Sequence, residues 1–364
     1  MTHRIIIWGT GFVGARTLRA VLENPAYELA GVIVSNPDKD GIDAGVLSGG
    51  EPVGVAASTN ADEVLARDAH AVAYFGPSAM YAEQNIENFK RALSAGKNVI
   101  DTSMGGLIHP ATAPAEMTEP IAAACATGGV SFLSTGIDPG FANTLFPLAL
   151  MGLAGRVDTV RIQEIIDFGT YPVASAATTM GLGLAPGEPA MIGMPGVATL
   201  AWGAAMRLIA DKMGVVLERV DEVYEQWFTE DEIVYPTGVV KPGHCGAAHT
   251  EIQGVVAGEP RIFIDHYHRM APQAAPDWPK ATLSEIDTYR VEIKGSPNIV
   301  QETTFRDAVS GDGNAGGCLA TGMHAIHLVP ALVDAPPGLF NVAELPLAVG
   351  RGVFDARAEM GKSI

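Results

Sequence analysis

Gly9-Thr10-Gly11-Phe12-Val13-Gly14 decides the fold of this 364-residue chain, because it matches the pattern G-x-G-x-x-G in a suitable context. It follows Arg4–Trp8, an Ile-rich run that predicts a buried parallel strand, and opens a predicted helix over Phe12–Leu22. The first glycine permits a tight turn, the second lets a pyrophosphate approach the backbone, and the third lets helix and strand pack closely. The helix start offers N–H groups and partial positive charge to phosphates. A strand–helix turn without a ligand is the alternative, but motif, context and position together predict a dinucleotide site.

The same strand–helix alternation continues outward from this motif. Further strands are predicted at Leu29–Val34, Ala71–Phe75, Asn98–Asp101 and Val130–Ser134, with helices at Tyr81–Ala95 and Ala115–Ala126. Strands separated regularly by helices are typical of a parallel, doubly wound sheet. Residues 1–140 are therefore predicted to form an α/β Rossmann domain.

The pattern changes after about residue 140. The sequence predicts strands with partly polar faces at Val157–Ile166, Arg261–His268, Thr288–Lys294 and Asn298–Phe305, and helices at Pro195–Met213 and Leu217–Trp227. Such strands favour an antiparallel sheet with helices on one side. We therefore predict a second, α+β domain over residues 141–315. A helix at Cys318–Val333 is predicted to begin a segment, 316–364, that packs back on the first domain.

Composition and charge exclude several classes of partner. The net charge of −18 disfavours nucleic acid and membrane surfaces, although the charge could serve solubility alone. The three cysteines, Cys125, Cys245 and Cys318, are far apart and odd in number, which disfavours a disulfide framework and predicts a reducing cytoplasm. The N-terminal apolar run is too short for a signal peptide, and the longest apolar stretches are shorter than the roughly 20 residues that span a bilayer.

Residues at the carboxyl ends of the predicted strands should line the dinucleotide site. An acidic residue normally ends the second strand of an NAD-specific fold, but here Ser35 and Asn36 occupy that place, with Lys39 nearby. These donors favour a 2′-phosphate and hence NADP, while Asp38 leaves NAD open and Lys39 could simply be a solvated turn residue. Two further segments complete the predicted lining, and they comprise Phe75, Gly76 and Pro77, and Thr102, Ser103 and Met104.

Four segments in this order carry a resemblance to a known family. After the first motif come Gly136-Ile137-Asp138-Pro139-Gly140-Phe141, then Met180-Gly181-Leu182-Gly183, then Pro336-Pro337-Gly338-Leu339. With them, nearly the whole chain resembles the actinobacterial dihydrodipicolinate-reductase-like proteins, which include the 2,4-diaminopentanoate dehydrogenases and the native amine dehydrogenases. The resemblance implies a Rossmann domain, an α+β substrate and dimerisation domain, a homodimer, and NAD(P)-dependent interconversion of an amine with a ketone and ammonia.

The chain departs from this family at one functional position. The amine dehydrogenases of the group have a catalytic glutamate just after the strand that here ends at Asp101, whereas this chain has Ser103-Met104-Gly105-Gly106. The family's usual Asn before Pro-Gly-Phe is Asp138 here, which could return a carboxylate to the pocket. Without such a carboxylate, a ketone or imine reductase that uses no ammonia is the alternative.

Hydride transfer leaves charge on oxygen or nitrogen and so needs a proton donor within hydrogen-bond reach. Our candidates are Asp138, His109 and Tyr171. Asp138 could instead cap a helix starting near Phe141, His109 could be an exposed loop residue, and Tyr171 could be a core or interface residue.

The other histidines favour structural roles, and no metal site is predicted. His266 and His268 share one face of a predicted strand, but no third ligand is evident nearby. His324 and His327 lie three apart on a predicted helix and are expected to pack against the first domain. His244 and His249 flank Cys245, but zinc there would need a further ligand.

Together these features predict a cytoplasmic NAD(P)-dependent oxidoreductase acting on a small amine, ketone or imine. The apolar stretch Met180–Met194 could line a substrate cleft between the domains or form a surface loop. A catalytically silent dinucleotide-binding protein is the alternative from a different class.

Overall fold

The computed structural model describes residues 2–77, 79–236, 238–284 and 287–354. The chain divides into two compact units, Met1–Gly136 with Thr321–Ile364, and Ile137–Ala320. The predicted first boundary, residue 140, falls just inside the second unit. Residues 355–364 of the predicted C-terminal segment lie outside the described residues.

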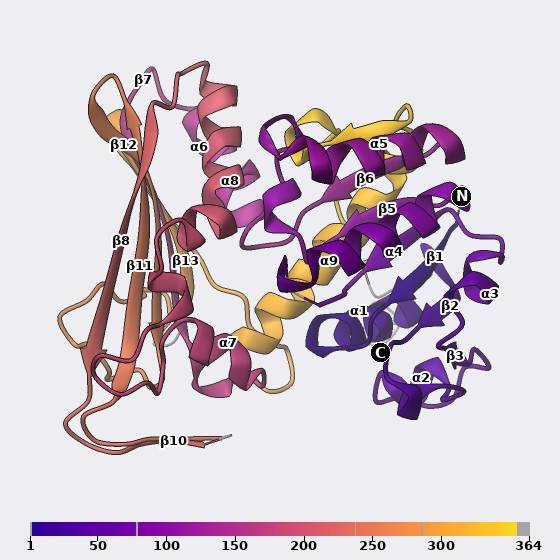
Figure 1. Ribbon diagram of the computed structural model, residues 1–364, viewed down its shortest axis with the longest axis horizontal. Helices are drawn as coiled ribbons and strands as arrows, with labels where there is room; N and C mark the ends of the chain where they lie inside the picture. The colour runs from indigo at the N-terminus through magenta and orange to yellow at the C-terminus, as the bar shows by residue number, and fades with distance from the viewer. Residues whose placement is uncertain (1, 78, 237, 285–286, 355–364) are drawn as a thin grey trace, which may run out of the picture. The chain divides into compact units, whose positions relative to one another are not determined.

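The first unit is built on a parallel sheet of seven strands in the order β15-β6-β5-β4-β1-β2-β3 (Figure 1). All of its strand pairs are parallel. The strands are β1 (His3–Trp8), β2 (Tyr27–Ile33), β3 (Ala57–Ser58), β4 (Ala71–Tyr74), β5 (Asn98–Asp101), β6 (Ser131–Ser134) and β15 (Gly338–Phe340). Since β15 pairs with β6, the C-terminal segment contributes an edge strand to this sheet. The predicted doubly wound α/β architecture is confirmed.

Helices enclose this sheet and complete its core. They are α1 (Phe12–Glu23), α2 (Ala44–Leu47), α3 (Ala61–Leu65), α4 (Ala82–Ser94) and α5 (Ala115–Gly128), joined by α9 (Gly313–Val333), which begins in the second unit. Ile5, Ile6 and Ile7 are fully buried, as the continuous apolar run of a parallel strand requires. Tyr74, Phe89 and Phe132 form the aromatic part of the core between sheet and helices.

Among the described residues, α9 is one helix with the length and apolar composition needed to cross a membrane. Half of its most apolar stretch is buried inside the protein, as expected for a core helix. Ala325, Ile326 and Val329 are completely buried.

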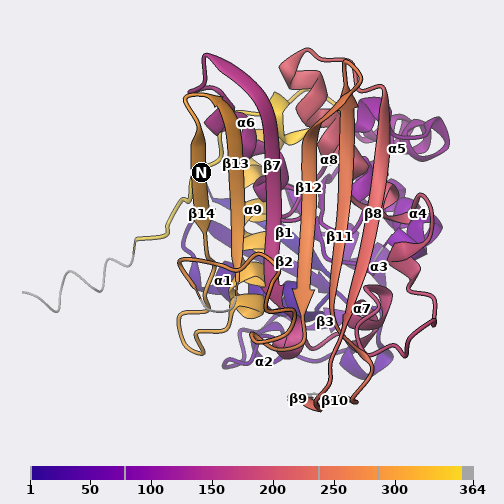
Figure 2. The same cartoon turned by 90° about the vertical axis from the view of Figure 1, so that its left-hand side faces the viewer.

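The second unit is built on a six-stranded sheet in the order β14-β13-β7-β12-β11-β8, seen face-on in Figure 2. The strands are β7 (Arg156–Asp167), β8 (Arg219–Phe228), β11 (Cys245–Val256), β12 (Glu259–Arg269), β13 (Thr288–Ser296) and β14 (Ile299–Thr303). The sheet is mixed rather than antiparallel throughout, because β7 and β12 run parallel. The helices are α6 (Leu145–Met151), α7 (Ala174–Thr179) and α8 (Val197–Met213), of which α8 packs on β8, β11 and β12. A small ribbon pairs β9 (Ile233–Tyr235) with β10 (Gly238–Val240).

One predicted helix of this unit is wrong. Leu217–Trp227 carries apolar residues at helical spacing, yet Arg219–Phe228 is a strand that pairs along its length with β11. Its Val, Tyr, Trp and Phe residues suit a pleated, half-buried surface, and pairing with β11 overrides the helical spacing. For β11 the sequence indicated only a strand start near His249, because its Gly and Ala residues give a weak strand signal.

Candidate functional site

The glycines of the first motif meet three different steric demands. Gly9 has a φ of +100°, and a Cβ there would lie 2.3 Å from the Phe75 carbonyl oxygen. A Cβ on Gly14 would lie 2.0 Å from the Gly9 carbonyl oxygen, so this glycine is required for packing. A Cβ on Gly11 would meet nothing within 4 Å, so the protein alone does not require glycine there. Gly11 is also the N-cap of α1 and brings no side-chain cap to that helix, so its N-terminal end faces open space.

A cavity of about 590 Å³ opens beside this loop, at the carboxyl ends of β1, β2 and β4. Among the described residues that line it there is no Asp or Glu, whereas Lys39 and Arg91 contribute two cations. In a chain of net charge −18, a lining with two cations and no carboxylate is compatible with an anionic ligand, although Arg91 is already paired with Asp62. The lining comprises Trp8, Gly9, Thr10, Gly11, Ile33, Val34, Ser35, Asn36, Lys39, Thr59, Ala61, Tyr74, Phe75, Gly76, Pro77, Gln84, Asn88 and Arg91.

Lys39 is held against the glycine loop. Its Nζ donates to the Thr10 carbonyl oxygen at 2.8 Å and to the Thr10 hydroxyl at 3.1 Å. The Asn36 side chain accepts from the Asp38 N–H at 3.0 Å and so caps the turn Pro37–Lys39. Asp38 itself is exposed and is not part of the cavity lining.

The remaining predicted cofactor residues lie elsewhere in the first unit. Phe12, Val13 and Gly14 form the first turn of α1 and do not line the cavity. Thr102 donates its N–H to the Tyr74 carbonyl oxygen. Ser103 and Met104 donate their N–H groups to the fully buried Asp101 carboxylate at 2.8 and 3.0 Å. Burial raises the pKa of Asp101, and these donors counteract it. Cofactor contacts from all six residues stay predictions.

The sequence did not single out the α4 side of the cavity. Gln84, Asn88 and Arg91 follow one another at spacings of four and three residues, which places them on one helix face. The Arg91 guanidinium pairs with Asp62 at 2.7 Å and lies 6.0 Å from the Trp8 ring. Polar residues at this spacing were the available signal, but an exposed helix face gives the same pattern.

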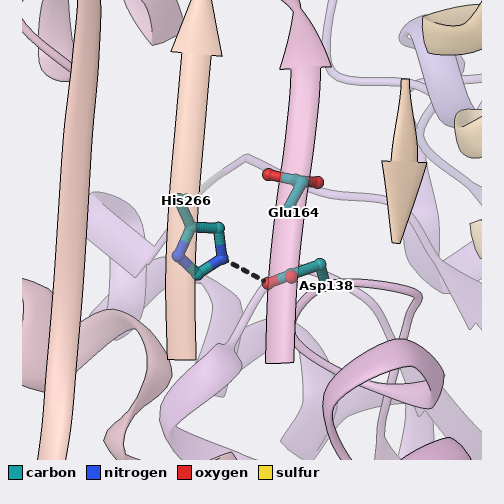
Figure 3. Close-up of side chains that lie close together, drawn as sticks. All are labelled: Asp138, Glu164 and His266. Carbon is teal, nitrogen blue, oxygen red and sulfur yellow. Dashed lines mark hydrogen bonds and ion pairs between the residues drawn. The ribbon is translucent and has the colours of Figure 1, made fainter. Parts of the chain in front are cut away.

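In the second unit, Asp138 is the centre of a buried cluster (Figure 3). Three donors converge on its Oδ1 atom: Trp202 Nε1 at 2.7 Å, Asn143 Nδ2 at 2.9 Å and His266 Nε2 at 3.1 Å. The Trp202 and His266 rings stack, with centroids 3.8 Å apart. Asp138 does not itself cap the following turn, because the N-cap residue is Gly140.

Strand register brings a second carboxylate to the same cluster. Glu164 on β7 lies opposite His266 on β12 and opposite Tyr289 on β13. It accepts from His268 Nε2 at 2.9 Å and from the Tyr289 hydroxyl at 2.8 Å. Burial opposes ionisation of Glu164, but these hydrogen bonds and the nearby His268 and His266 rings hold its pKa below the ordinary value. The sequence placed both histidines on one strand face but gave no sign that Glu164 faces them.

Asp138, Glu164 and His266 have ligand atoms within 4.8 Å of one another, but this group does not include His268, so it is not the predicted histidine pair completed by a third ligand. Three N–H donors already bond to Asp138, and an N–H and an O–H donor bond to Glu164. Because these N–H and O–H donors occupy the carboxylates, the cluster favours a hydrogen-bond network over a metal site. His249, Glu251 and Asp265 form another such group, but there Arg161 Nη1 bonds both carboxylates at 2.7 Å and supplies the positive charge. Neither group includes Cys245.

The other two catalytic candidates lie apart from Asp138's hydrogen bonds. His109, in the first unit, is buried rather than exposed. Tyr171, in the second, packs on the Phe168 ring at 5.0 Å, and burial raises its pKa, reinforced by Cys318 and Glu164. Catalytic roles for His109 and Tyr171 stay predictions. Of the helix pair, His327 bonds the Tyr27 hydroxyl through Nδ1 at 2.8 Å.

Comparison with known proteins gives consistent matches. The family model for the 2,4-diaminopentanoate dehydrogenase C-terminal domain matches residues 143–360. The chain is 36% identical to an amine dehydrogenase of Streptomyces virginiae over 95% of this chain and 97% of that protein. It is 24% identical to a 2,4-diaminopentanoate dehydrogenase of Acetoanaerobium sticklandii over 94% and 93% of the two chains.

Solved structures agree on the fold. An amine dehydrogenase from Mycobacterium smegmatis superposes with a TM-score of 0.77 at 20% identity, covering 97% of this chain and 99% of that one. A probable dehydrogenase from Thermotoga maritima gives a TM-score of 0.55 at 15% identity, over 93% and 91% of the chains.

Proposed function

Because the chain belongs to the 2,4-diaminopentanoate dehydrogenase family, we propose that it interconverts a small primary amine with its ketone and ammonia. Family membership makes the protein a dehydrogenase that takes a nicotinamide dinucleotide. NADP(H), rather than NAD(H), is our proposal for that cofactor.

The observation that carries this proposal is the cavity of the first unit. Gly11 leaves open space where a diphosphate can approach the helix start, and the lining described above presents two cations and no carboxylate. Both features fit a dinucleotide. The preference for NADP(H) rests on the end of β2, where Ser35, Asn36 and Lys39 replace the acid that would bind the ribose of NAD.

When bound, the nicotinamide supplies or accepts a hydride. The residues of this chain must then move protons, because an ammonium has to lose a proton before its carbon can give up a hydride. Asp138 suits that task, since three donors hold its Oδ1 atom and the contacts of the described residues include no hydrogen bond to its Oδ2 atom. The same carboxyl group would return the proton in the direction of amine synthesis.

Ammonium dependence tests the function. NADPH oxidation would be followed with cyclohexanone, butanone and pentan-2-one, with and without ammonium chloride. We expect oxidation only when ketone and ammonium are both present. Equal rates without ammonium would instead support a ketone reductase, and turnover of a preformed cyclic imine alone would support an imine reductase. Tight NADPH binding with no turnover of any ketone, imine or amine would support the silent dinucleotide-binding alternative.

A further inference from the structure

The hydrogen bonds of Asp138 are distributed unevenly between its two oxygens. Trp202, Asn143 and His266 all donate to Oδ1, and the contacts of the described residues include no hydrogen bond to Oδ2. The Asp138 side chain is only 5% exposed. A carboxylate oxygen has two lone pairs that accept hydrogen bonds, so Oδ2 keeps its full accepting capacity in a nearly dry environment.

We propose that His266 and Trp202 are positioning residues, which hold Asp138 by Oδ1 so that Oδ2 accepts the proton of the substrate ammonium. This assignment rests on the proposed amine dehydrogenase function. It gives a role to a histidine that sequence reasoning treats as structural. The proton moves from the substrate nitrogen to Asp138 Oδ2, which leaves a neutral amine and a neutral carboxylic acid.

The geometry gives the two residues separate tasks. Trp202 comes from α8 and supplies an N–H at 2.7 Å, and its ring stacks on His266 and fixes the orientation of that ring. His266 comes from β12, is 1% exposed and aims Nε2 at the same oxygen. Two rigid elements therefore set the torsion of one carboxylate, which is how a catalytic group is kept within a narrow range of angles.

Charge supports the same assignment. The groups that face His266 are Asp138 from the turn before α6, Glu164 from β7 and His268 from its own strand, while Trp202 from α8 is uncharged. Asp265, the neighbouring residue on β12, acts on His266 through its charge from the other face of the sheet. Burial lowers the pKa of His266, but the three carboxylates outweigh it and raise the pKa above the ordinary value. The positive charge that these carboxylates favour on His266 therefore lies beside Asp138, where the Nε2–H group is held toward Oδ1.

The test compares His266→Gln with His266→Ala. The Gln amide can still donate to Oδ1 but cannot carry charge, whereas Ala removes the donor. We expect His266→Gln to keep kcat/KM for the amine within about tenfold of the parent at its plateau. The acidic limb of its pH profile should move to higher pH, because Gln removes the positive charge that a protonated His266 places beside the carboxylate. His266→Ala, which removes the donor to Oδ1, should lose about 100-fold in kcat/KM, where each factor of ten corresponds to about 1.36 kcal/mol of activation free energy.

His249→Gln is the matched control. His249 is also a buried histidine of this sheet that lies beside carboxylates, but it stacks on Tyr267 and does not contact Asp138. The His249→Gln variant should change neither the plateau of kcat/KM nor the acidic limb of its pH profile. Trp202→Phe keeps an aromatic ring but removes the N–H, and should lower kcat/KM about tenfold with NADPH affinity unchanged.

A spectroscopic arm separates this proposal from the proposed function. In the intact protein, ring NMR signals of His266 should titrate at lower pH in Asp138→Asn than in the parent, and methylammonium chloride should perturb them in the parent alone. These shifts would uphold the proposal even if no ketone were aminated, an outcome that would count only against the proposed function. An unmoved acidic limb in His266→Gln, or an equal shift in His249→Gln, would overturn it.

Discussion

At the scale of single residues, Gly11 and Gly14 separate the demands of the ligand from those of the fold. Gly14→Ala would place a Cβ 2.0 Å from a backbone oxygen, so we expect a loss of stability of about 1–3 kcal/mol. Gly11→Ala meets no protein atom within 4 Å and should leave the melting temperature within about 2 °C of the parent, while NADPH affinity falls at least tenfold. Thermal unfolding and fluorescence titration measure the two effects. Equal destabilisation by both variants would show that the loop is built only for packing.

Lys39 is the residue on which the preference for NADP(H) depends. Its ammonium lies at the cavity wall, where a hydrogen bond to a charged group contributes about 1.5–3 kcal/mol. Lys39→Ala should therefore raise the Kd for NADPH roughly 10- to 100-fold and change the Kd for NADH less than threefold. Lys90→Ala removes the same charge from α4 outside the cavity lining and should change neither. If Lys39→Ala raised the Kd for NADPH and for NADH equally, the lysine would be supporting the glycine loop through Thr10 and not binding the 2′-phosphate.

At the scale of elements, a strand side chain caps the longest helix that lies wholly in the second unit. Glu222 on β8 accepts from the Gly196 N–H and the Thr199 N–H, both at 2.7 Å, at the start of α8. Burial opposes ionisation, but these hydrogen bonds hold the pKa of Glu222 below its ordinary value. Glu222→Ala should cost about 0.5–2 kcal/mol in the free energy of unfolding.

The pH dependence of this cap has a definite sign. Because the folded pKa is depressed, the stabilisation is present in full above the unfolded pKa, about 4.3, and is lost as pH falls through the folded value. Denaturant unfolding of parent and Glu222→Ala should thus differ at pH 7 and converge at lower pH. Glu222→Gln, which keeps one neutral acceptor, should fall between them. A difference that grew on acidification would contradict the cap.

Elements with one dominant pattern were predictable from the sequence, and the others were not. The first sheet followed from apolar runs such as Arg4–Trp8 and from the glycine motif, because a parallel strand buried on both faces leaves a continuous apolar signature. In β8, the apolar residues follow a helical spacing, and only the pairing with β11 makes the segment a strand. That pairing is a contact between segments separated in sequence, which a local pattern does not contain.

The candidate site divides in the same way. The glycine loop is itself the sequence motif, and Lys39 follows the next predicted strand of the same sheet. The place of both beside the cavity could therefore be predicted. Asp138 was singled out, but its partners Trp202 and His266 lie 64 and 128 residues away. Glu164 was not singled out, because only the parallel register of β7 and β12 places it beside His266.

At the scale of the whole molecule, the charge of the cavity lining is opposite in sign to the net charge of the chain. A net charge of −18 repels polyanions, yet the described lining of the cavity carries only cationic and neutral side chains. The phosphates of the proposed dinucleotide would therefore gain their affinity locally, from the start of helix α1, Lys39 and Arg91.

This local affinity should appear in the stability of the whole chain. A ligand that binds only the native state at 100 times its Kd stabilises by about 2.7 kcal/mol, and 1 kcal/mol shifts a domain of 150–250 residues by roughly 2–4 °C. Saturating NADPH should hence raise the melting temperature of the transition that includes the first unit by roughly 5–10 °C. Gly11→Ala should lose most of that increment at the same concentration, and Lys39→Ala should lose the advantage of NADPH over NADH. If NADPH raised the melting temperature of Gly11→Ala as much as that of the parent, the nucleotide would be binding away from the glycine loop, and the cavity at the ends of β1, β2 and β4 would need another ligand.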